Sequence, residues 1–275
     1  MKRSIMWFRY DLRLYDNVAL TAACKADTCY PIYIFDEHST RPIGEASGVW
    51  LHHALISLNK SLQGSLSLFK GDSKSIIQSL TRELNISEIH VTQPIDPQLN
   101  DLDKICIENS FNQNCLFKQH EQHTLWNVDK VRKNDGTPFK VFSPFYRNGC
   151  AAQAEPDPPL ETANISNCKK CHSSKTLTEV CSLPSLPWAS DIIKSWDISE
   201  KGAQSQWKTF INEGLPHYKQ GRNFPDKPYI SRLSPYIHHG QISIRQLFHD
   251  AKKFGQGADR DHFISELGWR EFSYY

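Results

Sequence analysis

The chain lacks the features of a membrane or secreted protein. It has 275 residues and a mean hydropathy of −0.54, and no apolar run approaches the roughly 20 residues that a helix needs to cross a bilayer. The first apolar stretch is soon interrupted by Arg9 and Asp11, so the amino terminus does not resemble a signal peptide. We therefore expect a cytoplasmic protein with no membrane partner.

The chain also has little net charge. Its 32 Lys and Arg side chains against 30 Asp and Glu give a net charge of +2 at pH 7, too small to indicate a nucleic-acid-binding protein on its own. If nucleic acid binds, a local patch of the surface must contact its phosphates. The composition is otherwise globular, with 39% hydrophobic and 11% aromatic residues, so the chain can bury a sizeable core.

Eight cysteines are scattered along the chain, and Cys168 and Cys171 have the spacing of a metal-ligand pair. His172 and Cys181 follow them, but the surrounding segment is polar and contains no second close pair. Buried or idle thiols are the commoner role of cysteines in a cytosolic chain. We expect no metal site and interpret Cys168 and Cys171 as surface thiols, with a zinc site as the alternative.

The first 125 residues alternate strand-like and helix-like patterns. Short buried runs predict five strands, at residues 4–8, 30–35, 65–69, 86–91 and 116–119. Amphipathic patterns between these runs predict helices, the first of which begins after the capping pair Asp16 and Asn17. Repeated strand–helix units form a parallel sheet with helices on both faces. The sequence therefore predicts a doubly wound, five-stranded α/β domain.

The remainder of the chain has a different character. Residues 151–187 are rich in Pro, Ser, Asn and Cys and lack sustained periodicity, which predicts a long connecting segment between domains. After Trp188 the pattern becomes helical, and it stops at Tyr275 without a capping signal. The predicted organisation is an α/β domain at 1–128, an interdomain linker at 129–195, and the start of an incomplete all-α domain at 196–275.

Three motifs occur in order along this background. Residues 7–17 read WFRYDLRLYDN, residues 218–240 contain YKQGRNFP and SRLSPYIHHG, and residues 266–272 read ELGWREF. A softer match, KVFSPF, lies at 140–145. Together they resemble motifs of the DNA photolyase and cryptochrome family, and within it a class I photolyase of cyclobutane pyrimidine dimers. The resemblance implies that the helical part is a FAD-binding domain.

The stretch 230–234 places Ser hydroxyls and Arg232 just before a helical pattern. Hydroxyls and the free amides of a helix start can hold the pyrophosphate of a dinucleotide, although helix capping alone is the plainer interpretation. The family uses the matching stretch for FAD phosphates. The resemblance implies FAD contacts at Tyr218, Ile230, Ser231, Arg232, Leu233, Ser234 and Phe263.

On a helix, five residues near the carboxyl end share one face: Phe263, Glu266, Trp269, Arg270 and Ser273. A ring, a carboxylate and a guanidinium on one face suit a flipped-out base lesion. The resemblance implies that Glu266 and Trp269 contact the lesion and that Arg222 contacts DNA, and we add Arg270 and Ser273 to the predicted DNA-binding set. The alternative for Trp269 is a core aromatic.

The implied activity is light-driven repair of cyclobutane pyrimidine dimers by electron transfer from reduced FAD. Damaged DNA is the implied partner, and a full-length parent is expected to be a monomer. Three alternatives stay open: a cryptochrome-like blue-light receptor, a photolyase of (6-4) photoproducts, and a truncated product without activity. Glu266 and Trp269 favour repair, because a receptor does not need a surface that stacks on a lesion.

Two departures from the family pattern limit the resemblance. Residues 92–99, TQPIDPQL, lack the glutamate and basic residues that follow the fourth strand in many folate-binding members. The antenna chromophore, folate or deazaflavin, and its presence therefore stay undetermined. The catalytic electron-transfer tryptophans and most isoalloxazine contacts of the family are expected beyond Tyr275. We therefore expect the 275-residue chain alone neither to hold FAD stably nor to repair DNA. His238 and His239 are expected to serve packing.

Overall fold

The computed structural model describes residues 1–37, 43–111, 114–181, 183, 187–224 and 226–275. Pro225 of the second motif and residues 182 and 184–186 of the predicted linker lie outside the described residues. The strands are β1 (Arg3–Phe8), β2 (Thr28–Asp36), β3 (Ser67–Gly71), β4 (Glu88–Thr92) and β5 (Leu116–His120). The helices are α1 (Val18–Ala23), α2 (Glu45–Ser61), α3 (Ser73–Glu83), α4 (Pro97–Phe111), α5 (Phe142–Pro144), α6 (Leu177–Val180), α7 (Ala189–Ser195), α8 (Glu200–Thr209), α9 (Tyr218–Gly221), α10 (Ser234–His238), α11 (Ile244–Phe254) and α12 (Gly257–Tyr274). Short turns of 3-10 or π helix lie at Val128–Lys130, Phe145–Cys150, Phe210–Gly214 and Leu215–His217.

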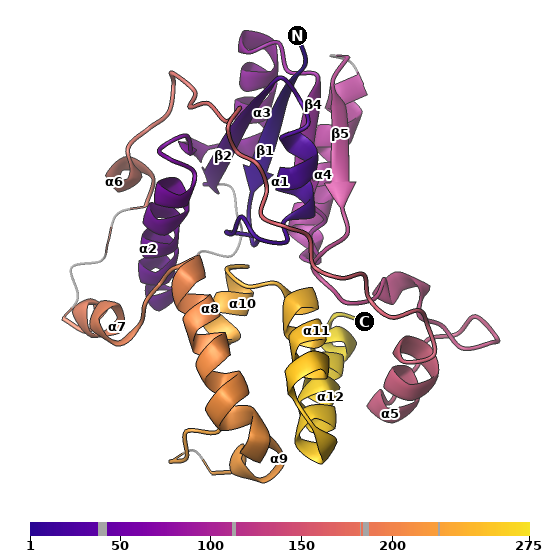
Figure 1. Cartoon of the computed structure of the whole chain (residues 1–275). Coiled ribbons are helices and arrows are strands. Elements are labelled where there is room, and N and C mark those ends of the chain that lie inside the picture. Colours follow the sequence, from indigo (N-terminus) through magenta and orange to yellow (C-terminus); the bar gives the residue numbers. More distant parts are fainter. Residues whose placement is uncertain (38–42, 112–113, 182, 184–186, 225) are drawn as a thin grey trace.

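The five strands form one parallel sheet in the order β3-β2-β1-β4-β5. The central strand β1 is buried on both faces, because Ile5 and Trp7 pack in one core while Met6 and Phe8 pack in the other. Helices cover the sheet on both sides (Figure 1). The predicted doubly wound, five-stranded α/β fold is confirmed, and each predicted run overlaps an observed strand.

Helices α8 to α12 form a separate layer at the carboxyl ends of the strands (Figure 1). Side chains cap helices of both layers: at α1 the Asn17 side chain accepts a hydrogen bond from Leu20 N at 2.9 Å, and at α8 Ser199 accepts one from Gly202 N at 2.8 Å. From residue 196 onward the described residues contain helices and turns and no strand, as predicted. None of the helices in the described ranges has the length and apolarity to span a membrane.

The first motif joins the sheet to the helical layer. Arg13 donates through Nη1 to the carbonyl of Gly240 at 2.9 Å, and the fully buried Asp16 forms an ion pair with Arg245 of α11. The carboxylate of Glu200, at the start of α8, accepts two backbone N–H groups of the chain that follows β1, each at 2.9 Å. One hydrophobic core runs continuously from the sheet into the helices. The motif therefore sets how the two parts pack together.

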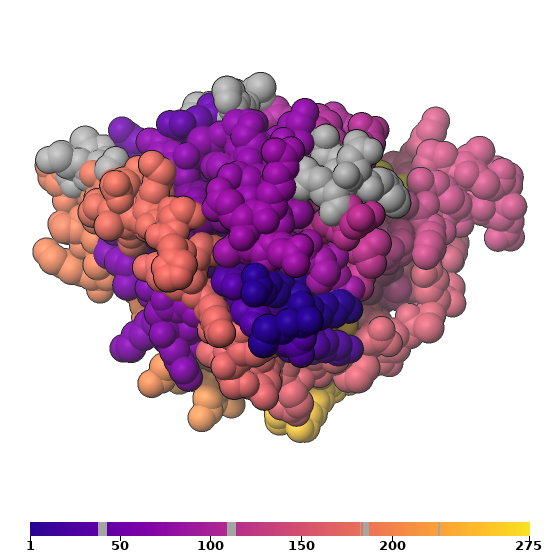
Figure 2. Space-filling view, turned by 90° about the horizontal axis from the view of Figure 1, so that it is seen from above, coloured from indigo at the N-terminus to yellow at the C-terminus, as the bar shows by residue number. Residues whose placement is uncertain are grey.

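The segment predicted as a linker packs against the sheet. The backbone N–H groups of Lys169 and Lys175 donate to the carbonyls of Cys29 in β2 and Leu68 in β3, both at 2.8 Å. Seen from above, its salmon-coloured part borders the indigo amino-terminal residues (Figure 2). Cys171 is only 4% exposed in the core beside β2 and β3. The interpretation of Cys171 as a surface thiol is therefore wrong, because a segment without periodicity can still cover a sheet.

Candidate functional site

The predicted flavin-contacting residue Phe263 lies at the centre of an aromatic cluster. Its ring centroid is 5.5 Å from that of Trp207, 5.2 Å from Phe210 and 5.4 Å from Tyr218. Trp207 donates its indole N–H to Asp250 at 2.9 Å, which fixes the ring between α8 and α11. The sequence predicted only a helical face for Trp207 and Phe210. The cluster connects α8, α9 and α12, and so supports both predicted sites.

Two of the predicted DNA contacts, Arg222 and Glu266, form an ion pair with each other. Both side chains are about one-third exposed, at 31% and 28%. His262 lies 3.3 Å from the Arg222 guanidinium, which also stands 5.6 Å from the ring centroid of Tyr218. The hydrogen bond to Glu266 raises the pKa of Arg222. The pair thus connects the residues predicted to contact DNA with Tyr218, which is predicted to contact FAD. Nothing in the sequence singled out His262.

The stretch 230–234, predicted to bind FAD phosphates, forms an irregular turn before α10. Arg232 has a left-handed backbone with φ of 52°, which is uncommon for a residue with a side chain. Its guanidinium carbon lies 4.3 Å from the ring centroid of Trp196. The carbonyl of Ser231 accepts a hydrogen bond from Gln206 of α8 at 3.0 Å. The stretch is therefore held by Gln206 of α8 and by Trp196, the residue that follows α7.

The residues of the predicted FAD set differ in exposure. Ile230, Arg232 and Ser234 are exposed and Ser231 is partly exposed, whereas Tyr218, Leu233 and Phe263 are buried at 9%, 1% and 4%. Side chains from the first group are available to a phosphate. The buried residues Tyr218, Leu233 and Phe263 pack against each other or within the core, so they support the exposed residues without being accessible themselves. Sequence similarity assigned both groups to one cofactor and carried no information on this division.

Trp269 is 44% exposed and is not the core aromatic of the alternative interpretation. One face of its indole ring stacks on Phe142, with ring centroids 3.9 Å apart and planes inclined by 12°. Phe142 belongs to the softer motif KVFSPF, whose last residue, Phe145, is fully buried against Phe272 and Tyr275. The KVFSPF motif therefore supplies the aromatic ring on which Trp269 stacks.

The predicted single face of α12 is divided among different neighbours. Arg270 donates to Glu271 at 3.1 Å and lies 4.7 Å from the ring centroid of Tyr274. Ser273 is exposed and donates its hydroxyl proton to the carbonyl of Trp269 at 2.9 Å. The structure therefore places Glu266 beside Arg222, and Trp269 beside Phe142. Arg270 turns toward the end of the helix.

A separate cavity of about 300 Å³ lies at the carboxyl ends of β1 and β4. These adjacent strands connect outward in opposite directions, which is the switch point where doubly wound sheets bind ligands. Its walls are formed by Arg9, Tyr10, Thr92, Gln93, Pro94, Ile95, Asp96, His123, His238 and Tyr274. The wall includes part of the segment 92–99, whose sequence left the antenna chromophore undetermined.

Arg9 is the basic residue in the wall of this cavity. Its guanidinium lies 4.0 Å from the ring centroid of Trp7 and pairs through Nη2 with the buried Asp103. Its Nε and Nη1 atoms are buried and have no hydrogen-bond partner among the described residues. Burial lowers the pKa of His123 to about 3 and also lowers that of His238, so both imidazoles are neutral at pH 7. Arg9 therefore lines a cavity whose other walls are mostly uncharged side chains with one carboxylate, Asp96, a feature that sequence reasoning missed.

A five-stranded doubly wound sheet joined to helices that carry these motifs defines a photolyase-type flavoprotein fold. The DNA photolyase family model matches residues 4–163, which is more than half of the chain. The chain therefore belongs to the DNA photolyase family.

Comparison with individual proteins supports this family assignment. The chain is 33% identical over 280 residues to a deoxyribodipyrimidine photo-lyase of Agrobacterium fabrum, covering 98% of this chain and 58% of that protein. It is 26% identical over 291 residues to cryptochrome-1 of Arabidopsis thaliana, covering 99% of this chain and 42% of that protein. The crystal structure of a class III photolyase from Agrobacterium tumefaciens superposes with a TM-score of 0.92 at 31% identity, covering 100% of this chain and 58% of that one. The chain thus spans less than two thirds of these relatives. The class I assignment stays a prediction.

Proposed function

We propose that this chain forms the chromophore-binding and lesion-facing part of a light-driven enzyme that repairs cyclobutane pyrimidine dimers. Residues 1–128 would hold an antenna, residues 129–195 would connect the parts, and residues 196–275 would bind FAD phosphates and damaged DNA. The protein would act as a monomer. The observation that carries the proposal is the exposed ring of Trp269, held flat on Phe142. A ring fixed in this way with its surface accessible suits stacking on an unpaired base.

The phosphate-side residues fit a dinucleotide such as FAD. Ser231, Arg232 and Ser234 are at least partly exposed at a turn held by α8, so hydroxyls and a guanidinium are available together. Tyr218 and Phe263 are buried in the aromatic cluster and offer little surface to a flavin ring. When bound, reduced FAD would supply the photoexcited electron that opens the dimer. The chain's own residues would bind the phosphates and position the lesion.

Each residue proposed to face the lesion would make a different contact with the DNA. Trp269 would stack on the extruded bases and exclude water from one side of them. Glu266 would contact base edges, and Arg222 would contact phosphate. Because these two side chains neutralise each other in the structure, each can shift toward its own DNA partner only by weakening the ion pair. Arg270 and Ser273 stay in the proposed DNA-binding set.

We further propose that the cavity at β1 and β4 holds the antenna chromophore. A folate or deazaflavin has a flat ring for the walls around Tyr10 and Tyr274. Its carbonyl or anionic groups would be attracted to Arg9, which lines the cavity and has buried N–H groups without partners among the described residues. Replacing Arg9 with Met should weaken binding of a reduced folate or deazaflavin at least about tenfold in fluorescence titration, since a lost charge-assisted hydrogen bond is worth roughly 1.5–3 kcal/mol. Equal binding by both proteins would contradict this site.

Lesion recognition can be tested on the chain itself, with FAD in excess. Trp269→Ala should weaken binding to an oligonucleotide with one dimer about tenfold or more, since stacking on a base is worth roughly 1–3 kcal/mol. The same change should hardly affect undamaged DNA. Arg222→Gln should weaken both DNAs similarly and reduce the salt dependence. Fluorescence anisotropy at several salt concentrations measures both effects.

A receptor role is the second candidate, favoured by the similarity to Arabidopsis cryptochrome-1. A receptor would use the same chromophore sites without selecting damaged DNA. If Trp269→Ala and Arg222→Gln change binding of both DNAs equally, or if the chain does not prefer the dimer, the repair proposal fails and the receptor role is favoured.

A further inference from the structure

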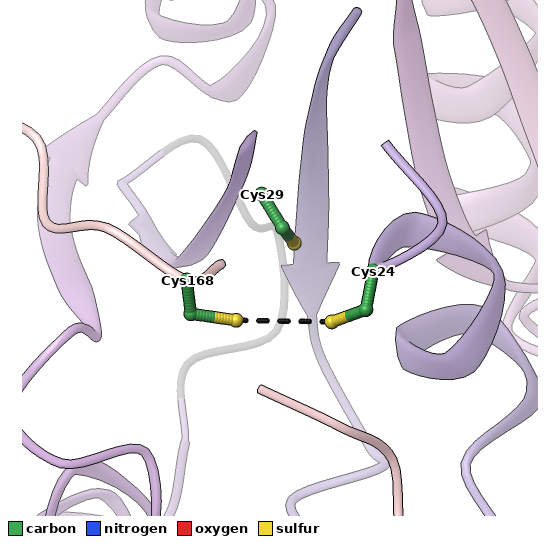
Figure 3. Close-up of side chains that lie close together, drawn as sticks. All are labelled: Cys24, Cys29 and Cys168. Carbon is green, nitrogen blue, oxygen red and sulfur yellow. Dashed lines mark hydrogen bonds between the residues drawn. The ribbon is translucent and has the colours of Figure 1, made fainter. Parts of the chain in front are cut away.

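Three cysteines that are distant in the sequence meet beside the first two strands. Cys24 ends α1, Cys29 lies in β2, and Cys168 lies in the segment that crosses the sheet (Figure 3). All three Sγ atoms lie within 4.8 Å of one another, and those of Cys24 and Cys168 are 3.7 Å apart. The cluster is separate from the aromatic cluster and from the cavity at β1 and β4.

The backbone holds these positions without help from the sulfur atoms. Cys29 donates its N–H to the carbonyl of Asn167 at 3.1 Å and accepts the N–H of Lys169 at 2.8 Å, so Cys168 runs alongside β2. The Asn167 side chain donates to the carbonyls of Cys24 at 3.0 Å and Ala26 at 2.6 Å. Two independent sets of hydrogen bonds therefore fix the segment against both other cysteines.

The spacing of the sulfur atoms suits one metal ion. Three sulfur ligands at about 2.3 Å from a metal lie roughly 3.8–4.0 Å from each other, so the three atoms need only small side-chain rotations. We propose that Cys24, Cys29 and Cys168 bind a single thiophilic cation, Zn²⁺ or Cu⁺, through three thiolates. Binding forms three metal–sulfur bonds and releases to solvent those thiol protons that are still present.

The nature of the ion follows from the ligands. Soft thiolates select Cu⁺ and Zn²⁺ over harder ions. Within the described residues no histidine, carboxylate or fourth cysteine shares the group, so zinc would need a water as its fourth ligand, whereas three sulfurs can serve copper alone. Cys24 and Cys168 are partly exposed, which leaves an entry path. The ion would fasten the crossing segment to the sheet.

The test uses the full chain, purified under reducing, metal-free conditions. We expect one equivalent of at least one ion to bind in anaerobic titrations, with Zn²⁺ competed by a zinc indicator and Cu⁺ by a bicinchoninate chelator. Cys24→Ser and Cys168→Ser should each weaken binding at least about 100-fold, more than the loss of a supporting residue around a metal. Cys171→Ala is the matched control in the same segment and should bind as the unchanged protein does.

A second measurement needs no variant. The bound ion should protect the partly exposed Cys24 and Cys168 from alkylation in mass spectrometry and leave labelling of the buried Cys115 and Cys171 unchanged. The proposal is overturned if neither ion binds, if Cys171→Ala loses as much affinity as Cys168→Ser, or if alkylation is unchanged by metal. A Cys24–Cys168 disulfide in protein that takes up no metal after reduction would also overturn it.

Discussion

Asp16 connects the sheet to the helical layer, and its replacement by asparagine tests that connection. The carboxylate is fully buried and accepts hydrogen bonds from Ser243 and Arg245 of the helical layer. It also accepts the backbone N–H of Leu160 at 2.8 Å. The Arg245 side chain is itself only 12% exposed, so its charge has little water to compensate for a lost partner.

The size of the effect follows from what asparagine keeps and what it removes. The backbone at Asp16 is left-handed, with φ of 48°, and asparagine tolerates this conformation well. Its side-chain oxygen can still accept one hydrogen bond, so the main loss is the negative charge. Removing one partner of a buried ion pair costs about 3–5 kcal/mol, because the remaining charge stays buried and unpaired. We expect a loss of that size in the free energy of unfolding.

The assay is urea unfolding at pH 7, followed by both circular dichroism and tryptophan fluorescence. Arg245→Met should also destabilise the protein, and the double variant should lose about 1–3 kcal/mol less than the sum of the single changes. The control is Asp101→Asn, since Asp101 is 70% exposed in its pair with Lys104. That change should stay within about 0.5 kcal/mol. A loss below about 1 kcal/mol for Asp16→Asn, or additive losses in the double variant, would refute the reasoning.

Other parts of the structure carry further predictions. Burial raises the pKa of Glu271 to about 7, so the folded protein holds this proton more tightly than the unfolded chain does. Stability should then fall as the pH rises from about 4.5 to about 7, and Glu271→Gln should flatten that part of the profile in urea unfolding. Gly240→Ala should cost at least about 2 kcal/mol, because φ is +68° and a Cβ would lie 2.0 Å from the carbonyl oxygen of Tyr10. Gly136→Ala, at φ of +79° in open space, should cost only the backbone strain of roughly 1–2 kcal/mol, and thermal unfolding compares the two. Gel filtration with excess FAD should leave much less than one flavin per chain, since two of the predicted FAD contacts, Tyr218 and Phe263, are buried in the aromatic cluster.

The sheet could be predicted from the sequence because its signal is local. Strands β1 to β4 are short runs with mostly buried residues, and each is followed by a helix that returns the chain, whereas β5 has no buried residue and, among the described residues, no such helix directly after it. The contacts of the residues that follow β1 could not be predicted from local patterns. In the sequence Arg13 had only a place in a motif and Asp16 a place beside a helix cap, because their partners Gly240 and Arg245 lie more than 200 positions away.

Helical periodicity placed Glu266 and Trp269 on one side of α12, and the side-chain contacts then depended on tertiary packing. Glu266 meets Arg222, and Trp269 meets Phe142, which comes from the segment between the two domains. Neither pairing follows from spacing, since the helix fixes only the direction in which a side chain leaves. The resemblance supplied the roles of these residues, and the fold supplies the neighbours that decide their exposure and charge.

The grouping of the cysteines also depends on tertiary packing and could not be predicted from their spacing. Spacing directed attention to Cys168 and Cys171, yet these two thiols leave the segment toward different cores, since a stretch that pairs with a strand alternates its faces. Cys168 instead faces Cys24 and Cys29, which the parallel pairing with β2 brings within reach. Pairing between segments 139 or more positions apart is set by the backbone hydrogen bonds to Cys29 and by the Asn167 side chain, and not by any short motif. A thiol cluster of this kind can be recognised only when the position of the segment around Cys168 beside β2 is known. The same segment leads on to the helices that carry Arg222 and Trp269. An ion bound there would therefore stabilise the segment that connects the sheet to the helical layer.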